Sequence, residues 1–335
     1  MRRGMVIVAL VAIAVGAAPA DAKVPDDFYG VVAQGPLLAS DYEVMAGGGA
    51  GVLRFPIEWS QVEPQPGRYE FAQIDAIVNG AVAQGIDPMP FVWSVPAWIN
   101  PQKSRPPLGN ASEKDAWRRF LEVLAERYGS VVDRWQLWNE ANFKLYWKPK
   151  PSPRDYAELV RLSARAIRDR DPGAEILLGG VAPVKRGMLP WEFLEGLYRV
   201  KGIERHFDTV TVHPYFPRLV GVEFQIRQAL DEIEAARNRR AKVRVTELGW
   251  ASEGPAADPM TKGLEGQAKI LRRSFGLLKR HRRDWRLTGV DWHAFQDADP
   301  GGGEPVCSFC PGSGLLTFER EPKPAWEAYR EIAAG

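Results

Sequence analysis

Two glutamates, Glu140 and Glu247, each stand at the end of a short apolar run, where an acidic side chain can do chemistry. Two neighbouring carboxyl groups can have different catalytic roles: the protonated one acts as a general acid, and the ionised one acts as a nucleophile. Cleavage of a glycosidic bond with retention of configuration needs such a pair about 5–5.5 Å apart. The two glutamates therefore predict a site of this kind, provided that the fold brings these distant positions together.

Other polar residues end neighbouring apolar runs and would tune the two carboxyl groups. A cation at Arg54 and a hydroxyl at Tyr215 would hold Glu247 ionised, whereas an apolar setting would keep Glu140 protonated. Asn139 is placed to hold a sugar hydroxyl. Sugar rings pack their C–H faces on aromatic planes. The complete set of predicted substrate-binding residues is Arg54, Asn139, His213, Tyr215, Trp292, Trp93, Trp98, Trp147 and Trp250.

Each of these residues also has a purely structural interpretation. A glutamate at a strand end is often a solvated or ion-paired residue, His213 could be a buried, hydrogen-bonded histidine, and Arg54 could pair with a core carboxylate. Most of the 12 tryptophans must belong to the core. The coincidence of so many polar side chains at the carboxyl ends of predicted strands favours a carbohydrate site at Glu140 and Glu247.

The elements that must position these residues alternate between β-rich runs and amphipathic helical patterns. Such alternation predicts a parallel sheet with crossover helices, and a total of eight strands favours closure into a (β/α)8 barrel of the α/β class. No glycine-rich phosphate loop follows the first strand, which argues against an open nucleotide-binding sheet. In a barrel the carboxyl ends of all strands meet at one mouth. The predicted strands are 29–33, 51–55, 88–93, 134–138, 175–179, 208–213, 242–247 and 288–295.

Length and charge limit the range of functions. The 335 residues fit one large domain, residues 23–335, and we find no linker. The 44 basic and 42 acidic residues give a net charge of +2, so the overall charge provides no reason to expect nucleic acid or an anionic membrane as partner. We expect a monomer that acts on an oligosaccharide or polysaccharide and needs no cofactor.

The N-terminus has the pattern of a secretory signal peptide over residues 1–22. Arg2 and Arg3 precede an apolar run over 5–18, and Ala20-Asp-Ala22 forms a small-residue cleavage site. The apolar run is shorter than the ~20 residues that a membrane-spanning helix needs. We therefore expect a secreted protein, extracellular or periplasmic, with no span after cleavage.

The two cysteines, Cys307 and Cys310, are separated by two residues, a spacing that also occurs in redox and metal sites. Export favours a disulfide instead, and a zinc site would lack ligands because the chain has no second cysteine pair and only four histidines. Asp291 and His293 flank Trp292 without a ligand-spaced cluster beside them, so we predict no metal. The loop over 297–314 follows the last strand, and we hypothesise that the disulfide stiffens a substrate-contacting loop there.

Several segments resemble retaining glycoside hydrolases of clan A. The stretches Leu53-Arg-Phe-Pro-Ile-Glu-Trp59 and Glu63-Pro-Gln-Pro-Gly-Arg-Tyr-Glu-Phe71 resemble the second-strand region of that clan. The segment Trp138-Asn-Glu-Ala-Asn142, followed by Trp147, resembles the acid/base segment of glycoside hydrolase family 39. His213-Pro-Tyr215 and Thr246-Glu-Leu-Gly-Trp250 are similar to the sixth and seventh strands of the same group, and the likeness extends to Lys323-Pro-Ala-Trp326.

The resemblance implies a role for each matching residue. It assigns Glu140 as acid/base and Glu247 as nucleophile, with Arg54, Asn139, His213, Tyr215 and Trp292 in supporting positions. Ala141 departs from the family, which usually has proline after the acid/base glutamate. The family includes β-xylosidases, α-L-iduronidases and bacterial exopolysaccharide hydrolases. The short exported chain is most similar to the last group, with an endo-acting enzyme of family 5 as the second choice.

Two other functions remain compatible with the sequence. One is a carbohydrate-binding barrel without catalysis, which the retention of both glutamates argues against because binding alone needs neither. The other is a transglycosylase, which would use the same carboxyl pair and differ only in the acceptor.

Overall fold

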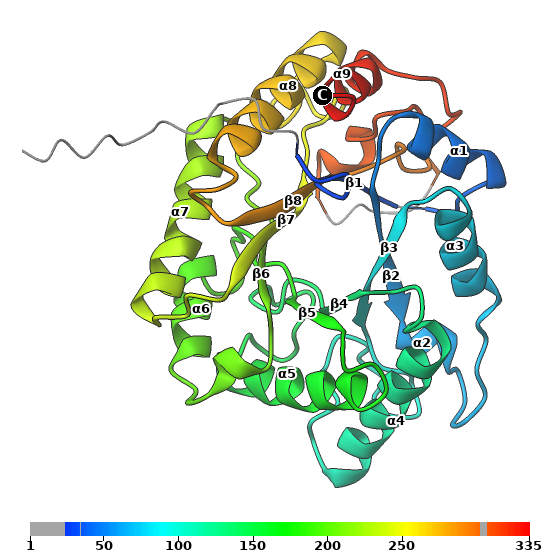
Figure 1. Cartoon of the computed structure of the whole chain (residues 1–335), viewed down its shortest axis with the longest axis vertical. Coiled ribbons are helices and arrows are strands. Elements are labelled where there is room, and N and C mark those ends of the chain that lie inside the picture. The colour runs from blue at the N-terminus through cyan, green and yellow to red at the C-terminus, as the bar shows by residue number, and fades with distance from the viewer. Residues whose placement is uncertain (1–23, 34, 302–306) are drawn as a thin grey trace, which may run out of the picture.

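Eight parallel strands close into a barrel in chain order, and helices surround it on the outside (Figure 1). The computed structural model describes residues 24–33, 35–301 and 307–335, so the predicted signal peptide lies outside the described residues. The prediction of a (β/α)8 barrel is confirmed. The strands are β1 (Tyr29–Val32), β2 (Val52–Glu58), β3 (Asp87–Trp93), β4 (Arg134–Leu137), β5 (Glu175–Leu178), β6 (Thr209–Val212), β7 (Lys242–Leu248) and β8 (Leu287–Trp292).

Helices connect successive strands and cover the outer face of the barrel (Figure 1). In the part of the chain that the structure describes, none of them is both long and apolar enough to span a membrane. They are α1 (Ala39–Gly47), α2 (Trp59–Val62), α3 (Ala72–Ala83), α4 (Ala111–Tyr128), α5 (Pro153–Arg168), α6 (Pro190–Tyr198), α7 (Leu219–Ala235), α8 (Leu264–His281) and α9 (Pro324–Ala333), with 3-10 turns η1 (Ile203–Arg205) and η2 (Cys310–Gly312).

Local sequence signals explain where the longer helices begin. Helix α4 starts after Asn110, whose side chain accepts a hydrogen bond from the backbone amide of Glu113. Helix α5 starts after Ser152 in the same way and has Pro153 in its first turn, where the missing amide hydrogen costs nothing. Both helices turn an apolar face toward the barrel, which fixes the direction in which the next strand returns.

Two strand ends differ from the predicted ones by more than one residue. Strand β2 extends to Glu58 because its pairing with β3 continues to the Glu58–Trp93 pair. Strand β8 ends at Trp292, three residues before the predicted end, where its pairing with β7 finishes at Leu248. The earlier end of β8 places His293 in the loop at the mouth.

A buried ion pair joins β7 and β8 inside the barrel. The Arg244 guanidinium contacts Asp291 through Nη2–Oδ1 at 2.6 Å and Nε–Oδ2 at 3.0 Å, and neither side chain is exposed to solvent. Gly30 on β1 leaves the necessary space, because a Cβ atom there would lie 2.1 Å from Asp291 Oδ1. Asp291 is therefore committed to a structural contact.

We expect the change Asp291→Asn to lower the free energy of unfolding by roughly 3–5 kcal/mol, because it leaves the Arg244 charge buried without a counter-charge. Urea denaturation followed by circular dichroism measures this loss. The exposed pair Arg272–Glu331, in which Nε and Nη2 both donate to one carboxylate oxygen, serves as the control. The control change Glu331→Gln should cost under about 1 kcal/mol. Equal losses in the two variants would contradict the structural role of the buried pair.

Candidate active site

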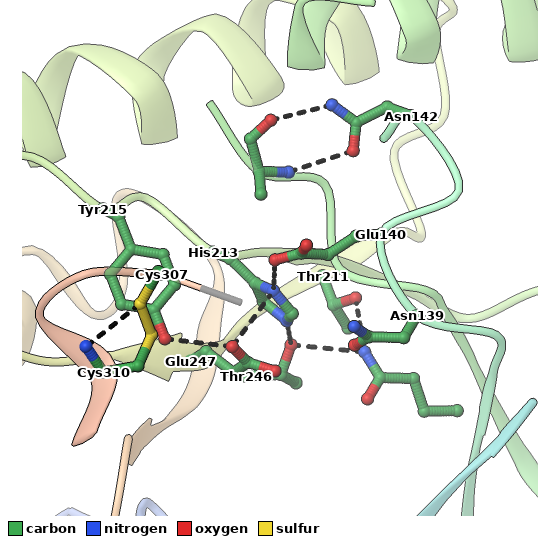
Figure 2. Close-up of polar contacts among 12 residues, drawn as sticks. Asn139, Glu140, Asn142, Thr211, His213, Tyr215, Thr246, Glu247, Cys307 and Cys310 are labelled. Carbon is green, nitrogen blue, oxygen red and sulfur yellow. Dashed lines mark hydrogen bonds and ion pairs between the residues drawn. A yellow bond between two sulfur atoms is a disulfide. The ribbon is translucent and has the colours of Figure 1, made fainter. Parts of the chain in front are cut away.

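The two predicted glutamates meet at the mouth of the barrel. Glu140 follows β4 and Glu247 lies near the end of β7, and Figure 2 shows their side chains converging on His213. One carboxyl oxygen of each glutamate and one ring nitrogen of His213 all lie within 4.8 Å of one another. Each glutamate side chain is 11% exposed, so solvent reaches both carboxyl groups.

Glu247 is surrounded by groups that stabilise a negative charge. Arg54 Nη1 lies 2.6 Å from Oε1, the Tyr215 hydroxyl donates to Oε2 at 2.9 Å, and His213 Nδ1 lies 3.5 Å from Oε2. Burial alone would raise the pKa of Glu247, but the charges of His213 and Arg54 outweigh it and lower the pKa to about 2. Glu247 is therefore ionised at ordinary pH.

The Arg54 guanidinium is held in place on three sides. Its Nε atom donates to Gln136 Oε1 at 2.7 Å and its Nη2 atom donates to Asn139 Oδ1 at 2.9 Å, while the Phe91 ring centroid lies 4.1 Å from Cζ. The side chain is completely buried. Because Arg54 belongs to β2 and Glu247 to β7, this contact crosses the barrel interior, and only the closed fold creates it.

We expect the change Arg54→Gln to raise the pKa of Glu247 and so move the acid limb of the kcat/KM profile to higher pH. The sign follows from the lost cation, since a carboxyl group without it binds its proton more readily. Kinetics on a glycoside between about pH 3 and 9 would show the shift, because that limb reports the free enzyme's essential base. The change Arg54→Lys keeps the charge and should leave the limb nearly in place while lowering kcat. Arg68→Gln, on the exposed turn after β2, is the control. An unmoved acid limb in Arg54→Gln would contradict the assignment.

The pKa of Glu140 is displaced in the opposite direction, upward. Burial raises its pKa most, and repulsion from Glu247 raises it further, against the hydrogen bond and the charge of His213. Its Oε1 atom lies 2.9 Å from His213 Nδ1, and no described residue forms a hydrogen bond with Oε2. Glu140 can therefore hold a proton on an oxygen that faces no protein partner.

His213 is fixed between the two carboxyl groups. Its Nε2 atom lies 3.0 Å from Thr246 Oγ1, which in turn accepts from Gln136 Nε2 at 3.2 Å. A Thr246 hydroxyl that accepts from Gln136 can donate to Nε2, so that the proton on Nδ1 is directed at Glu140. Gly180 makes room for the ring, because a Cβ atom there would lie 2.0 Å from Nε2. His213 thus orients Glu140.

The backbone around Glu140 is in an uncommon conformation. Trp138 has φ of 71° and Glu140 has φ of 41°, both in the left-handed region that side chains other than glycine rarely adopt. Asn142, which sequence reasoning missed, stabilises this turn. Its side-chain amide nitrogen donates to the carbonyls of Ala182 and Met188, and its oxygen accepts from the Ala182 amide. The Asn142 side chain is labelled in Figure 2. These bonds tie the loop after β4 to the loop after β5.

Three of the tryptophans predicted to bind sugar lie in the core. Trp250 and Trp292 are fully buried, pack against each other with ring centroids 6.1 Å apart, and direct their indole nitrogens to backbone carbonyls. Trp147 is 1% exposed and packs on Trp138. The prediction is therefore wrong for the stacking role of Trp147, Trp250 and Trp292, because their rings offer sugar no open face.

Trp93 and Trp98 lie nearer the mouth. Trp93 ends β3, is 8% exposed, and packs against Tyr146 with ring centroids 5.3 Å apart. The Lys103 ammonium lies 5.0 Å from the Trp93 ring centroid. Trp98 is half-buried and donates through Nε1 to the carbonyl of Glu63. Both remain candidates for contact with substrate.

His293, which the sequence suggests only as a poorly supported metal ligand, lies at the same mouth as the two glutamates. Its half-buried ring meets the edge of Tyr215 with centroids 6.2 Å apart. Burial lowers the pKa of His293 although the charge of Glu247 raises it, so the ring is neutral near pH 7. The signal for its position is the alternation along β8, which turns Asp291 inward and Trp292 toward α8.

Glu140, His213 and Glu247 have the composition of a metal-ligand set. A metal ion bound there would lie close to the Arg54 guanidinium, which is 2.6 Å from Glu247, and both His213 nitrogens already have hydrogen-bonding partners. The arrangement therefore suits proton transfer between protein groups better than metal binding.

The cysteine pair is found beside the same mouth. Cys307 and Cys310 form a disulfide, and the ring of Phe309 between them lies 5.5 Å from the Tyr215 ring. This short loop therefore packs against a residue that holds Glu247. Residues 302–306 of the predicted loop lie outside the described residues.

The sequence matches no protein-family model, but solved structures share its architecture. A family 39 glycoside hydrolase from Bacteroides cellulosilyticus WH2 aligns with TM-score 0.69 and 20% identity over 93% of this chain and 65% of its own. A monomeric beta-xylosidase from Caulobacter crescentus CB15 gives 0.71 and 21% over 92% and 68%. A variant of GH5_18 from Streptomyces cattleya, in complex with Manb1-4GlcNAc, gives 0.69 and 18% over 92% and 80%. This chain shares their barrel fold. It spans slightly less than two thirds of the length of the first of these proteins.

Proposed function

We propose that this protein is a retaining glycoside hydrolase that cleaves O-glycosidic bonds in an oligosaccharide or polysaccharide. One observation supports it above the others: two carboxyl groups with oxygens within 4.8 Å have pKa values displaced in opposite directions, Glu140 upward and Glu247 downward. Double displacement needs two carboxyl groups close together, about 5–5.5 Å apart, whereas inversion needs roughly 6.5–9.5 Å to admit a water molecule.

In the first step the Glu247 carboxylate attacks the anomeric carbon and the bond to the leaving-group oxygen breaks. Glu140 donates its proton to that oxygen, so the leaving sugar departs as an alcohol and a glycosyl ester forms on Glu247. In the second step the Glu140 carboxylate removes a proton from water, which attacks the same carbon and releases Glu247. Both glutamates return to their starting protonation states.

The surrounding residues support these steps by position. Arg54 and Tyr215 hold the nucleophile through hydrogen bonds of 2.6 and 2.9 Å. The Asn139 amide nitrogen has no acceptor among the described residues, so it is free to bind a hydroxyl beside the reacting carbon. His293 offers a second neutral hydrogen-bonding group at the same mouth.

Two further parts of the proposal are export of the protein and the class of bond that it cleaves. We infer export from the predicted signal peptide over residues 1–22. Among the neighbours are a beta-xylosidase and, from an Opitutaceae bacterium, an exo-beta-1,4-mannosidase. Because these two enzymes are named for different sugars, we propose for this chain only the class of bond, an O-glycosidic bond, and no particular sugar.

A panel of glycans tested with the wild type and Glu247→Gln examines the proposal. Turnover by the wild type that the variant loses supports it. Binding by both proteins with turnover by neither would replace it with a carbohydrate-binding role, and products longer than the substrate would indicate a transglycosylase. NMR of the first-formed anomer then tests retention, since inversion would contradict the assigned roles.

A further inference from the structure

Charged residues are distributed unevenly around the mouth of the barrel. The loops after β3, β4, β5 and β6 contain eight cations and, apart from Glu140, no acidic residue. We call these eight residues the basic arc: Lys103, Arg105, Lys144, Lys148, Lys150, Lys185, Arg186 and Arg218. Because the four strands are consecutive in the closed barrel, their loops are neighbours and the arc follows one half of the mouth.

The opposite half of the mouth has the reverse charge. The described loop residues after β2, β7 and β8 include four cations, Arg68, Lys262, Arg320 and Lys323. The acidic residues of the same loops are Glu63, Glu70, Glu253, Asp258, Asp297, Asp299, Glu319 and Glu321. Since the whole chain has 44 basic and 42 acidic residues, the basic arc reflects a separation of charges at the mouth and not a general excess of cations.

The cations of the arc are available to a ligand. Seven are exposed and Lys148 is half-buried. Within the described residues only Lys103 pairs with a carboxylate, that of Glu58 at 3.1 Å. A natural protein surface usually intersperses charges of both signs, because unpaired like charges repel one another. Seven unpaired cations on adjoining loops are therefore unfavourable in the free protein and call for an anionic partner.

The backbone holds the loops of the arc together. The amide of Lys144 donates to the carbonyl of Arg186 at 3.0 Å, and the amide of Lys148 donates to the carbonyl of Ser104 at 3.0 Å. The loop after β4 is thus bonded to the loops after β3 and β5. Their cations form one surface whose spacing the fold sets.

The basic arc lies on the side of the site where the leaving group must bind. Glu140 belongs to the central loop of the arc, and a general acid must reach the leaving-group oxygen within hydrogen-bond distance. At the edge of the arc the Lys103 ammonium lies over the ring of Trp93, which ends β3 beside the same site.

We propose that the substrate is an acidic polysaccharide and that its anionic units lie on the leaving-group side of the cleaved bond, over the basic arc. This inference rests on the proposed function, because the side is defined by Glu140 as acid. Carboxylate-bearing sugars present one charge per residue along an extended chain, which suits cations on successive loops. The acidic half of the mouth would disfavour the same charges on the other side of the bond.

The test is a binding measurement that needs no turnover. Calorimetric titration uses oligogalacturonate and oligomannuronate, each beside its methyl ester, which keeps the chain and removes the charge. The variant Lys144→Gln/Lys185→Gln/Arg186→Gln neutralises the middle of the arc. The control Lys269→Gln/Arg273→Gln/Arg280→Gln removes three exposed charges from α8 instead. Melting temperatures confirm that both variants fold.

We expect the wild type to bind at least one acidic oligosaccharide more tightly than its methyl ester. The arc variant should bind it about tenfold more weakly, and the control within about twofold. Salt near 0.5 M should reduce the preference, since exposed charges are screened. Equal affinity for the acidic oligosaccharides and their methyl esters would overturn the proposal, and so would an equal loss of affinity in the arc variant and the control. Equally tight binding of a single-stranded oligonucleotide of matched charge would also overturn it. Charge-selective binding without turnover of any glycan would instead refute only the hydrolase assignment.

Discussion

The change Glu247→Gln should lower kcat/KM by roughly 10⁴-fold or more, because an amide cannot act as the attacking carboxylate. Glutamine nearly preserves the size of the side chain, and its one amide oxygen can still accept from Arg54 while its NH2 group faces the Tyr215 hydroxyl oxygen, so the fold should persist. Steady-state kinetics on an aryl glycoside measures the loss. The control is Glu253→Gln, an exposed acid in the loop after the same strand, which should leave kcat/KM within about twofold.

The smaller variant Glu247→Gly tests the role and not only the importance of the residue. It opens a space on the attacking side, so added azide can approach the anomeric carbon where Glu247 did. We expect azide to restore turnover and to give a glycosyl azide of inverted configuration, because one displacement replaces two. A glycosyl azide of retained configuration would show that the two roles are exchanged. The same conclusion would follow if azide gave the inverted product with Glu140→Gly and not with Glu247→Gly.

The change Glu140→Gln should show a loss that depends on the leaving group. For a sugar alcohol, which must be protonated as it departs, the rate should fall by roughly 10²–10⁴-fold. For 2,4-dinitrophenolate, which leaves without a proton, formation of the glycosyl ester should change little. Comparing pre-steady-state bursts on the two substrates separates these cases, and Glu158→Gln on the exposed face of α5 is the control. Equal losses on both substrates would contradict the acid role.

The same variant has a consequence for pH dependence. Burial and the nearby Glu247 raise the pKa of Glu140, so the proton needed for the first step is present below that pKa and lost as pH rises through it. The wild type should therefore show an alkaline limb that Glu140→Gln lacks. The interacting pair titrates as a unit, so each limb reports the pair as a whole.

Much of the barrel is predictable because its signals are local. Apolar runs such as 242–247 match β7 within one residue, and the N-cap signal at Ser152 marks the start of α5. Once eight strands alternate with helices, closure places every strand's carboxyl end at one mouth. Glu140 and Glu247 could therefore be assigned to one site before any distance was known.

The aromatic part of the site could not be predicted in this way. Trp292 and His293 are adjacent at the end of β8, and side chains along a strand alternate between two faces. The alternation tells which of the two faces the mouth only once it is known which face of β8 turns inward, and the pairing with β7 and β1 decides that. Trp147 and Trp250 were misplaced for a related reason, because a buried tryptophan and a sugar-binding one look alike in the chain.

By itself the sequence determined the barrel, the pair of glutamates and the sign of each charge in the loops, since these depend on residue type and local periodicity. Only the tertiary structure decided that Arg54 reaches across the barrel to Glu247, and that His213 and burial act on Glu140. The physical reason is that a pKa depends on distances of a few ångströms between groups far apart in the chain. The division of labour between the two glutamates that we propose, and the continuity of the basic arc, both arise from that closure.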